Sequence, residues 1–87
     1  MDSTLIRLKG QVATLATNAR GMGEALERLK TACGGTASEI AQAISGTSRQ
    51  SDRAIIDTLH AAEAELGQAV AALRRAAHEA NQFATSL

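Results

Sequence analysis

The 87-residue sequence contains no proline, tryptophan or tyrosine, and Phe83 is its one aromatic residue. Without proline no position excludes a helix, and the abundance of Ala, Leu, Glu, Gln and Arg favours helices over strands. Cys33 is the single cysteine, so no disulfide can form within the chain, and no Cys/His cluster has the spacing of a zinc site. We therefore expect an all-α fold that uses no metal and no cofactor.

An excess of charge of one sign is also lacking, because nine basic residues are balanced by nine acidic ones. Neither basic runs nor interleaved aromatic residues are present, so we expect no nucleic-acid partner. No stretch approaches the roughly 18 apolar residues of a membrane span, and the first residues lack the pattern of a classical signal peptide. These features predict a protein made in the cytoplasm without an integral membrane segment, and they leave open export by a route that accepts folded proteins.

Apolar or small residues in the first third of the chain alternate at steps of three and four. A repeat of 3.5 residues over four heptads is what a helix needs to bury one narrow stripe against another helix. It predicts a helix over about residues 3–32. The stripe comprises Leu5, Leu8, Val12, Leu15, Ala19, Met22, Leu26, Leu29 and Cys33.

A second stripe predicts a helix over about residues 37–84. Its upstream part includes Ile40, Ile44 and Ile55, but it turns polar before Ile55, and two consecutive steps of four break the alternation there. We therefore expect a bend or an interruption near 45–55. The downstream part comprises Leu59, Ala62, Leu66, Ala69, Leu73, Ala76, Ala80 and Phe83.

Between the two stripes, the sequence Cys33-Gly34-Gly35-Thr36 is the clearest point for a chain reversal. Glycine accepts the left-handed conformation that ends many helices. A turn at 33–36 would join the predicted helices into an antiparallel hairpin, with each helix covering the other's stripe. The hairpin would be a single domain over residues 1–87.

A pair of helices leaves the flanks of both stripes uncovered. A chain of this size without disulfides or metal usually needs association to be stable, so we expect the hairpins to pair into a four-helix bundle. The uncovered flanks are Ile6, Ala13 and Ala16 on the first helix and Ile56, Val70 and Ala77 on the second. The residues expected to pack the helices or to contact the partner are Leu5, Leu8, Val12, Leu15, Met22, Leu26, Leu29, Ile40, Ile44, Ile55, Leu59, Leu66, Val70, Leu73 and Phe83.

The predicted turn motif consists of Ala32, Gly34 and Gly35. Gly34 is followed three residues later by Ala37, and three residues after that by the apolar Ile40. Together with the chain length and the predicted hairpin, this arrangement resembles the WXG family, the early-secretory-antigen-like small proteins exported by type VII secretion systems. In that family a tryptophan, any residue and a glycine link two antiparallel helices, followed by small residues and an apolar position. The resemblance covers essentially the whole chain.

Two features depart from the family pattern. Ala32 stands where the family has its tryptophan. Members that export themselves also carry a tyrosine near the C-terminus with an acidic residue four positions later, whereas neither His78 nor Phe83 is followed by an acid at that spacing. The resemblance therefore implies the partner in a heterodimer whose other subunit carries the export signal, or a divergent homodimer.

Few residues of the chain could carry chemistry. Cys33 has no histidine fixed beside it as a base, so we interpret it as a small residue packed at the turn, with an intermolecular disulfide as the alternative. His60 and His78 are eighteen residues apart, too far to share one metal ion. We expect each to be solvated or bonded to a neighbour such as Glu63 or Arg75. No catalytic, cofactor-binding or metal-binding residue is predicted, and we expect no enzymatic activity.

Charge is distributed unevenly along the chain. Residues 1–33 carry five basic and three acidic side chains, and residues 34–87 carry four basic and six acidic ones. This asymmetry favours antiparallel packing of the two helices and could orient a partner. Glu24 and Arg28 are also spaced for an ion pair within one helix.

Two functions fit these expectations. The first is a non-enzymatic interaction protein that pairs with itself or with a related hairpin and is associated with type VII secretion, as a substrate or as a targeting partner. The alternative is a cytoplasmic adaptor or chaperone-like module that binds the helical region of a larger protein, such as a secreted toxin.

Overall fold

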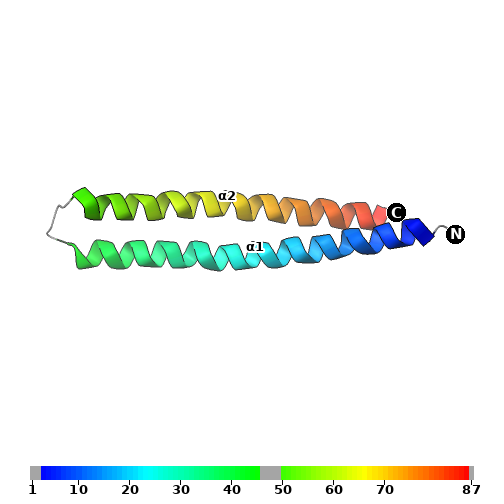
Figure 1. Ribbon diagram of the computed structural model, residues 1–87, viewed down its shortest axis with the longest axis horizontal. Helices are drawn as coiled ribbons and strands as arrows, with labels where there is room; N and C mark the ends of the chain where they lie inside the picture. Colours follow the sequence, from blue (N-terminus) through cyan, green and yellow to red (C-terminus); the bar gives the residue numbers. More distant parts are fainter. Residues whose placement is uncertain (1–2, 46–49, 87) are drawn as a thin grey trace.

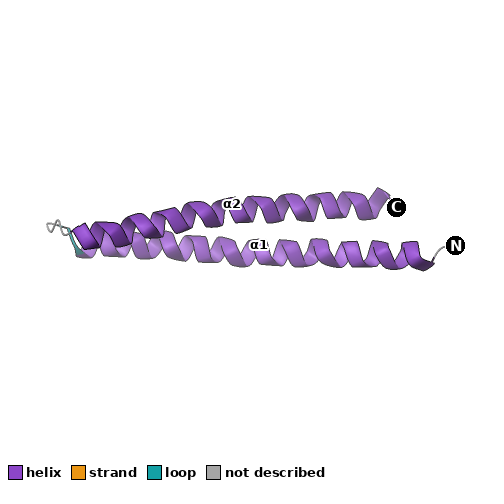
Figure 2. Ribbon diagram, turned by 45° about the horizontal axis from the view of Figure 1, so that its top comes forward, coloured by secondary structure: helices purple, strands orange, loops and turns teal. Residues whose placement is uncertain are grey.

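The computed structural model describes residues 3–45 and 50–86, which form two long antiparallel helices (Figure 1). Helix α1 spans Ser3–Ala43 and has 41 residues, and helix α2 spans Gln50–Ser86 and has 37. The two helices lie side by side in both views and make a rod of 71 × 14 × 14 Å (Figures 1 and 2). The predicted all-α antiparallel hairpin is confirmed.

The chain reverses at a different place from the one predicted. α1 continues through residues 33–36 without interruption, so the turn predicted there is wrong. Ala32, Gly34 and Gly35 are helical residues inside α1. The reversal lies between the end of α1 and the start of α2, which are at the same end of the rod (Figure 1).

Two opposing effects explain why the helix continues past the two glycines. A glycine inside a helix costs about 1 kcal/mol relative to alanine, so the pair costs about 2 kcal/mol. A reversal at 33–36 would leave the far end of the second helix without a facing helix, whereas the observed arms of 41 and 37 residues lie side by side over all but the first turns of α1 (Figure 1). Removing apolar surface from water contributes about 25 cal/mol per Å², so about 80 Å² of extra contact between the longer arms offsets the two glycines.

The interruption predicted near 45–55 falls where the chain reverses. The last turn of α1 is extended by a hydrogen bond of 3.0 Å from the backbone N–H of Ile44 to the carbonyl oxygen of Ile40. The residues that follow in the sequence are serine, glycine and threonine, which favour helices weakly. Residues 46–49 themselves lie outside the described part of the chain.

The fully buried positions of the contact between the two helices carry small side chains. Among the described residues, no apolar side chain larger than valine is buried. Small side chains at a contact allow the axes of packed helices to lie closer together. The buried apolar residues are Ala16, Ala19, Ala37, Val70, Ala77 and Ala84.

Candidate interaction surface

Each helix packs against the other through positions that alternate at steps of three and four, which we call the inner seam. About half of the residues of each predicted stripe lie in this seam. At the other seam positions, the residue that packs is the one that follows a predicted stripe residue, as Ala16 follows Leu15. On α1 the inner seam comprises Val12, Ala16, Ala19, Gly23, Leu26, Lys30, Cys33, Ala37, Ile40 and Ile44. On α2 it comprises Ile56, Leu59, Glu63, Leu66, Val70, Leu73, Ala77, Ala80 and Ala84.

The structure divides the predicted interface residues into two groups. Leu15 is 59% exposed, whereas its neighbour Ala16 is 1% exposed and takes the place in the seam. The flanks predicted to be open at Ala16, Val70 and Ala77 are buried, so that prediction is wrong. The predicted interface residues that are 41–59% exposed are Leu5, Leu8, Leu15, Met22, Leu29, Ile55 and Phe83.

Two charged side chains interrupt the inner seam, and each lies over a glycine of the opposite helix. A Cβ atom on Gly34 would lie 2.8 Å from Oε2 of Glu63, and a Cβ atom on Gly67 would lie 3.6 Å from Cε of Lys30. The bare backbone of Gly34 therefore leaves room for the Glu63 carboxylate, and Gly67 does the same for Lys30. A slip of one helix along the other would press these half-buried side chains onto bulkier residues, so the two pairs favour a single register.

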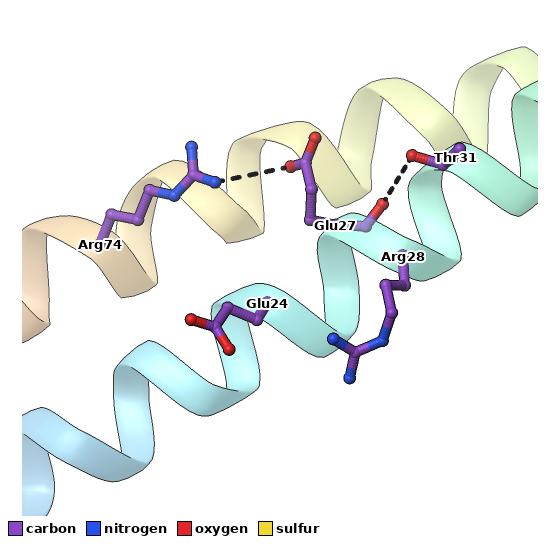
Figure 3. Close-up of a pocket in the computed structure, with 5 residues that line it drawn as sticks. All are labelled: Glu24, Glu27, Arg28, Thr31 and Arg74. Carbon is purple, nitrogen blue, oxygen red and sulfur yellow. Dashed lines mark hydrogen bonds and ion pairs between the residues drawn. The ribbon is translucent and has the colours of Figure 1, made fainter.

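A polar face runs along one side of the seam. Nδ1 of His60 lies 3.2 Å from Oε1 of Glu63, and the His60 side chain is 59% exposed, which agrees with the expectation that it is solvated or bonded to a neighbour. Nη2 of Arg74 on α2 lies 4.0 Å from Oε2 of Glu27 on α1 and links the helices (Figure 3). This ion pair is largely exposed, so it contributes at most about 1 kcal/mol.

A shallow hollow on the polar face is lined by Glu24, Glu27, Arg28, Thr31 and Arg74 (Figure 3). The Thr31 hydroxyl donates to the backbone carbonyl of Glu27 at 3.1 Å. The expected ion pair between Glu24 and Arg28 does not form. The described residues bring no three His, Cys, Asp or Glu side chains together to hold a metal ion.

The opposite side of the hairpin exposes large apolar side chains, and we call it the outer face. On α1 its large residues repeat every seven positions and are 41, 59, 57 and 50% exposed, in the order Leu8, Leu15, Met22 and Leu29. The column beside them is exposed and uncharged and comprises Gln11, Asn18, Ala25 and Ala32. α1 thus carries a second helix-packing repeat without one charged residue, and α2 does not cover it.

α2 contributes smaller side chains to the same outer face. The cross-helix contacts of Glu27 with Arg74 and of Gly34 with Glu63 place the polar face on one side of the seam. On the other side of the seam of an antiparallel pair, the residues that precede every second seam position of each helix lie together. On α1 these are the residues before Ala16, Gly23 and Lys30, namely Leu15, Met22 and Leu29. On α2 these residues are Ile55, Ala62, Ala69, Ala76 and Phe83, and the column beside them is Thr58, Glu65, Ala72 and Glu79.

An exposed apolar stripe of this length is typical of a surface that contacts another molecule. Within the described residues, neither helix holds an apolar stretch long enough to cross a membrane.

Cys33 lies in the inner seam, half-buried and with a free thiol. It was expected at a turn, but it is a residue of α1 that faces α2. The prediction that it packs as a small residue agrees with this position. Its thiol has no histidine or other base as a hydrogen-bond partner.

No family model matches the chain, and no curated protein or solved structure matches it. The two faces of the hairpin are therefore the basis on which its function has to be inferred.

Proposed function

We propose that this chain is a non-enzymatic helical-hairpin interaction protein that binds a second helical hairpin through its outer face. The partner is either a copy of the chain or a related small protein. The uncharged and exposed repeat on α1 between Leu8 and Ala32 carries this proposal. Fully burying a Leu or Met side chain contributes about 1.5–3 kcal/mol, so the four half-exposed residues of this repeat favour a partner that covers them.

The thin core of the single hairpin supports the same proposal. Its fully buried apolar side chains are five alanines and Val70, and the leucines of the inner seam are only partly buried. A chain of this size without a disulfide or a metal usually reaches adequate stability by association. Two hairpins that cover each other's outer faces would form a four-helix bundle.

The mass of the particle in solution tests this proposal. At micromolar concentration, size-exclusion chromatography with light scattering should give a multiple of the 9.0 kDa chain, or a complex with a co-expressed hairpin. Leu15→Asp should abolish the association while circular dichroism remains helical, because Leu15 lies outside the inner seam. Thr17→Asp adds the same charge to another exposed side of α1 and should associate like the unmodified chain. A stable folded monomer that binds no helical hairpin would contradict the proposal.

We further propose an association with type VII secretion, as a substrate or as a targeting partner. This proposal rests on the two-helix antiparallel architecture. The residues from Ala32 to Ile40 lie inside α1 and form no turn, so they lend it no support. Deleting the secretion ATPase of the source organism should abolish export of this chain or of its partner, and unchanged export would contradict the link.

A helical region in a larger protein could also cover the outer face, as an adaptor or chaperone-like role would require. Co-expression with the products of neighbouring genes separates the two cases. We expect a complex with another small hairpin or a homo-oligomer. A complex formed only with one larger polypeptide would favour the adaptor role.

A further inference from the structure

The outer face presents side chains of complementary size on its two helices. Gly23 packs against Leu73, because a Cβ built on the glycine would lie 3.8 Å from the Cβ of Leu73. This contact shows that Gly23 of α1 and Leu73 of α2 lie at the same height along the rod. At this level α1 exposes the large side chains of Met22 and Leu29. The outer face of α2 carries small ones at the same level, namely Ala69, Ala72 and Ala76.

The two helices also carry opposite net charge. The described α1 has five basic and three acidic residues, and α2 has three basic and five acidic ones. A helix that packs on α2 is therefore electrostatically complementary to α2 when its own net charge is positive. α1 has a positive net charge, so α1 of a second copy is such a helix.

Two copies can place their outer faces together about a two-fold axis in two ways. With the axis parallel to the helices, α1 of each copy lies antiparallel on α2 of the other, and the two connections lie at the same end. With the axis across the helices, α1 lies on α1 and α2 lies on α2, and the connections lie at opposite ends.

We infer that the partner on the outer face is a second copy of this chain, packed about a two-fold axis parallel to the helices. This inference rests on the proposed function and names its partner. Met22 and Leu29 of one copy fill the space over the alanines of the other copy's α2. Every helix in the bundle then has neighbours of opposite net charge.

The other arrangement lacks both kinds of complementarity. It sets the large residues of the two α1 helices against each other and leaves the alanines of the two α2 helices facing alanines. It also brings Glu65 and Glu79 from both copies into one seam, where like charges repel. The arrangement that pairs α1 with α2 avoids the crowding between large residues, the unfilled space between alanines and the repulsion between glutamates.

A distance between spin labels on two copies tests the arrangement. Gln42 is exposed near the end of α1, so Gln42→Cys in a Cys33→Ser background accepts one label per chain. With connections at the same end, a helix spacing of 8–10 Å places the labels about 30 Å apart. With connections at opposite ends, the 1.5 Å rise per residue places them about 55 Å or more apart. Dilution with unlabelled chain should weaken the distance signal, which shows that the two labels are on different copies. If Cys33→Ser lowers helicity, Cys33→Ala is used in its place.

A substitution pair tests the same contact without labels. Ala72 is exposed in the single hairpin, so Ala72→Leu should leave helicity unchanged while it clashes with Met22 of the other copy. We expect the dimer dissociation constant to rise about tenfold or more, and we expect Met22→Ala to restore most of the affinity in the double variant. Ala61→Leu, at an exposed position of α2 outside the outer face, is the matched control and should not change the dissociation constant.

The outcomes distinguish this inference from the proposed function. A distance near 30 Å and rescue by Met22→Ala support the inference. A homodimer with the long distance, or without rescue, overturns the arrangement and leaves the proposed function intact. A chain that is monomeric alone but binds a different hairpin overturns self-association only, whereas a monomer that binds neither overturns both.

Discussion

Adjacent positions on α1 show how differently the two sides of one helix are used. Ala16 is 1% exposed against α2, whereas Leu15 is 59% exposed on the outer face. The same contrast recurs one heptad later, where Gly23 is buried and Met22 is 57% exposed. The side with small residues makes the close contact within the chain, and the side with large residues remains for another molecule.

The largest expected effect comes from a charge in the inner seam. Ala37 is 0% exposed, so Ala37→Asp would bury an unpaired carboxylate and should lower the free energy of unfolding by at least about 3 kcal/mol. Thermal unfolding followed by circular dichroism measures this loss. Thr36→Asp, at the exposed neighbouring position, should change stability by less than about 0.5 kcal/mol. Equal effects at the two positions would remove the distinction between the two sides.

Changing the size of the adjacent residues 15 and 16 sharpens the comparison. Ala16→Leu overfills a close contact and should destabilise the hairpin by about 1–3 kcal/mol. Leu15→Ala should instead raise the dimer dissociation constant and scarcely change the helicity of the hairpin. Urea unfolding at several protein concentrations separates the two effects, because only a change in association depends on concentration. A concentration-independent loss for Leu15→Ala would contradict the assignment of Leu15 to the outer face.

The two adjacent glycines should respond differently to alanine. A Cβ on Gly35 meets nothing within 4 Å, so Gly35→Ala should stabilise the helix by about 1 kcal/mol. A Cβ on Gly34 would lie 2.8 Å from the Glu63 carboxylate, so Gly34→Ala should gain less or lose stability. In the Glu63→Ala background the two glycine substitutions should become equivalent. Chemical denaturation measures the free energy of unfolding of each variant. Equal gains in stability for Gly34→Ala and Gly35→Ala in the chain that keeps Glu63 would show that Glu63 does not use the space over Gly34.

The smallest effect is expected on the polar face. Glu27→Gln removes the ion pair with Arg74, whose atoms are 4.0 Å apart and largely exposed, and should cost less than about 1 kcal/mol. The loss should shrink further at high salt, because screening weakens exposed pairs. A larger loss that does not respond to salt would mean that this pair contributes more to the hairpin than its exposure indicates.

The helical class and the 3.5-residue repeat could be read from the sequence, because both depend on local composition and spacing. Val12, Leu26, Leu59, Leu66 and Leu73 were placed in a seam, and they lie in the inner seam. The seam's second column was missed, because ranking residues by hydrophobicity selects the leucines over the small residues beside them. The available signal was that small residues recur at multiples of seven positions: Ala16, Gly23 and Ala37 on α1, with Lys30 between the last two, and Ala77 and Ala84 on α2.

The place of the chain reversal could not be read from local preference. Two adjacent glycines are a stronger local helix breaker than the single glycine with serines and threonine around residue 47, yet α1 continues through Gly34 and Gly35. Gly34 proved to be a packing residue that makes room for Glu63. A glycine needed for close approach and a glycine needed for a turn look the same in a sequence.

The sequence by itself determined that this protein is helical and that each helix has a stripe able to pack on another helix, because propensity and periodicity act over a few residues. The tertiary structure decided which side of α1 faces α2 and where the chain turns. Both choices depend on contacts between residues far apart in the chain: small residues allow the helix axes to approach, and arms of similar length lie side by side over most of their length (Figure 1). The same choice leaves the large residues of α1 on the outer face.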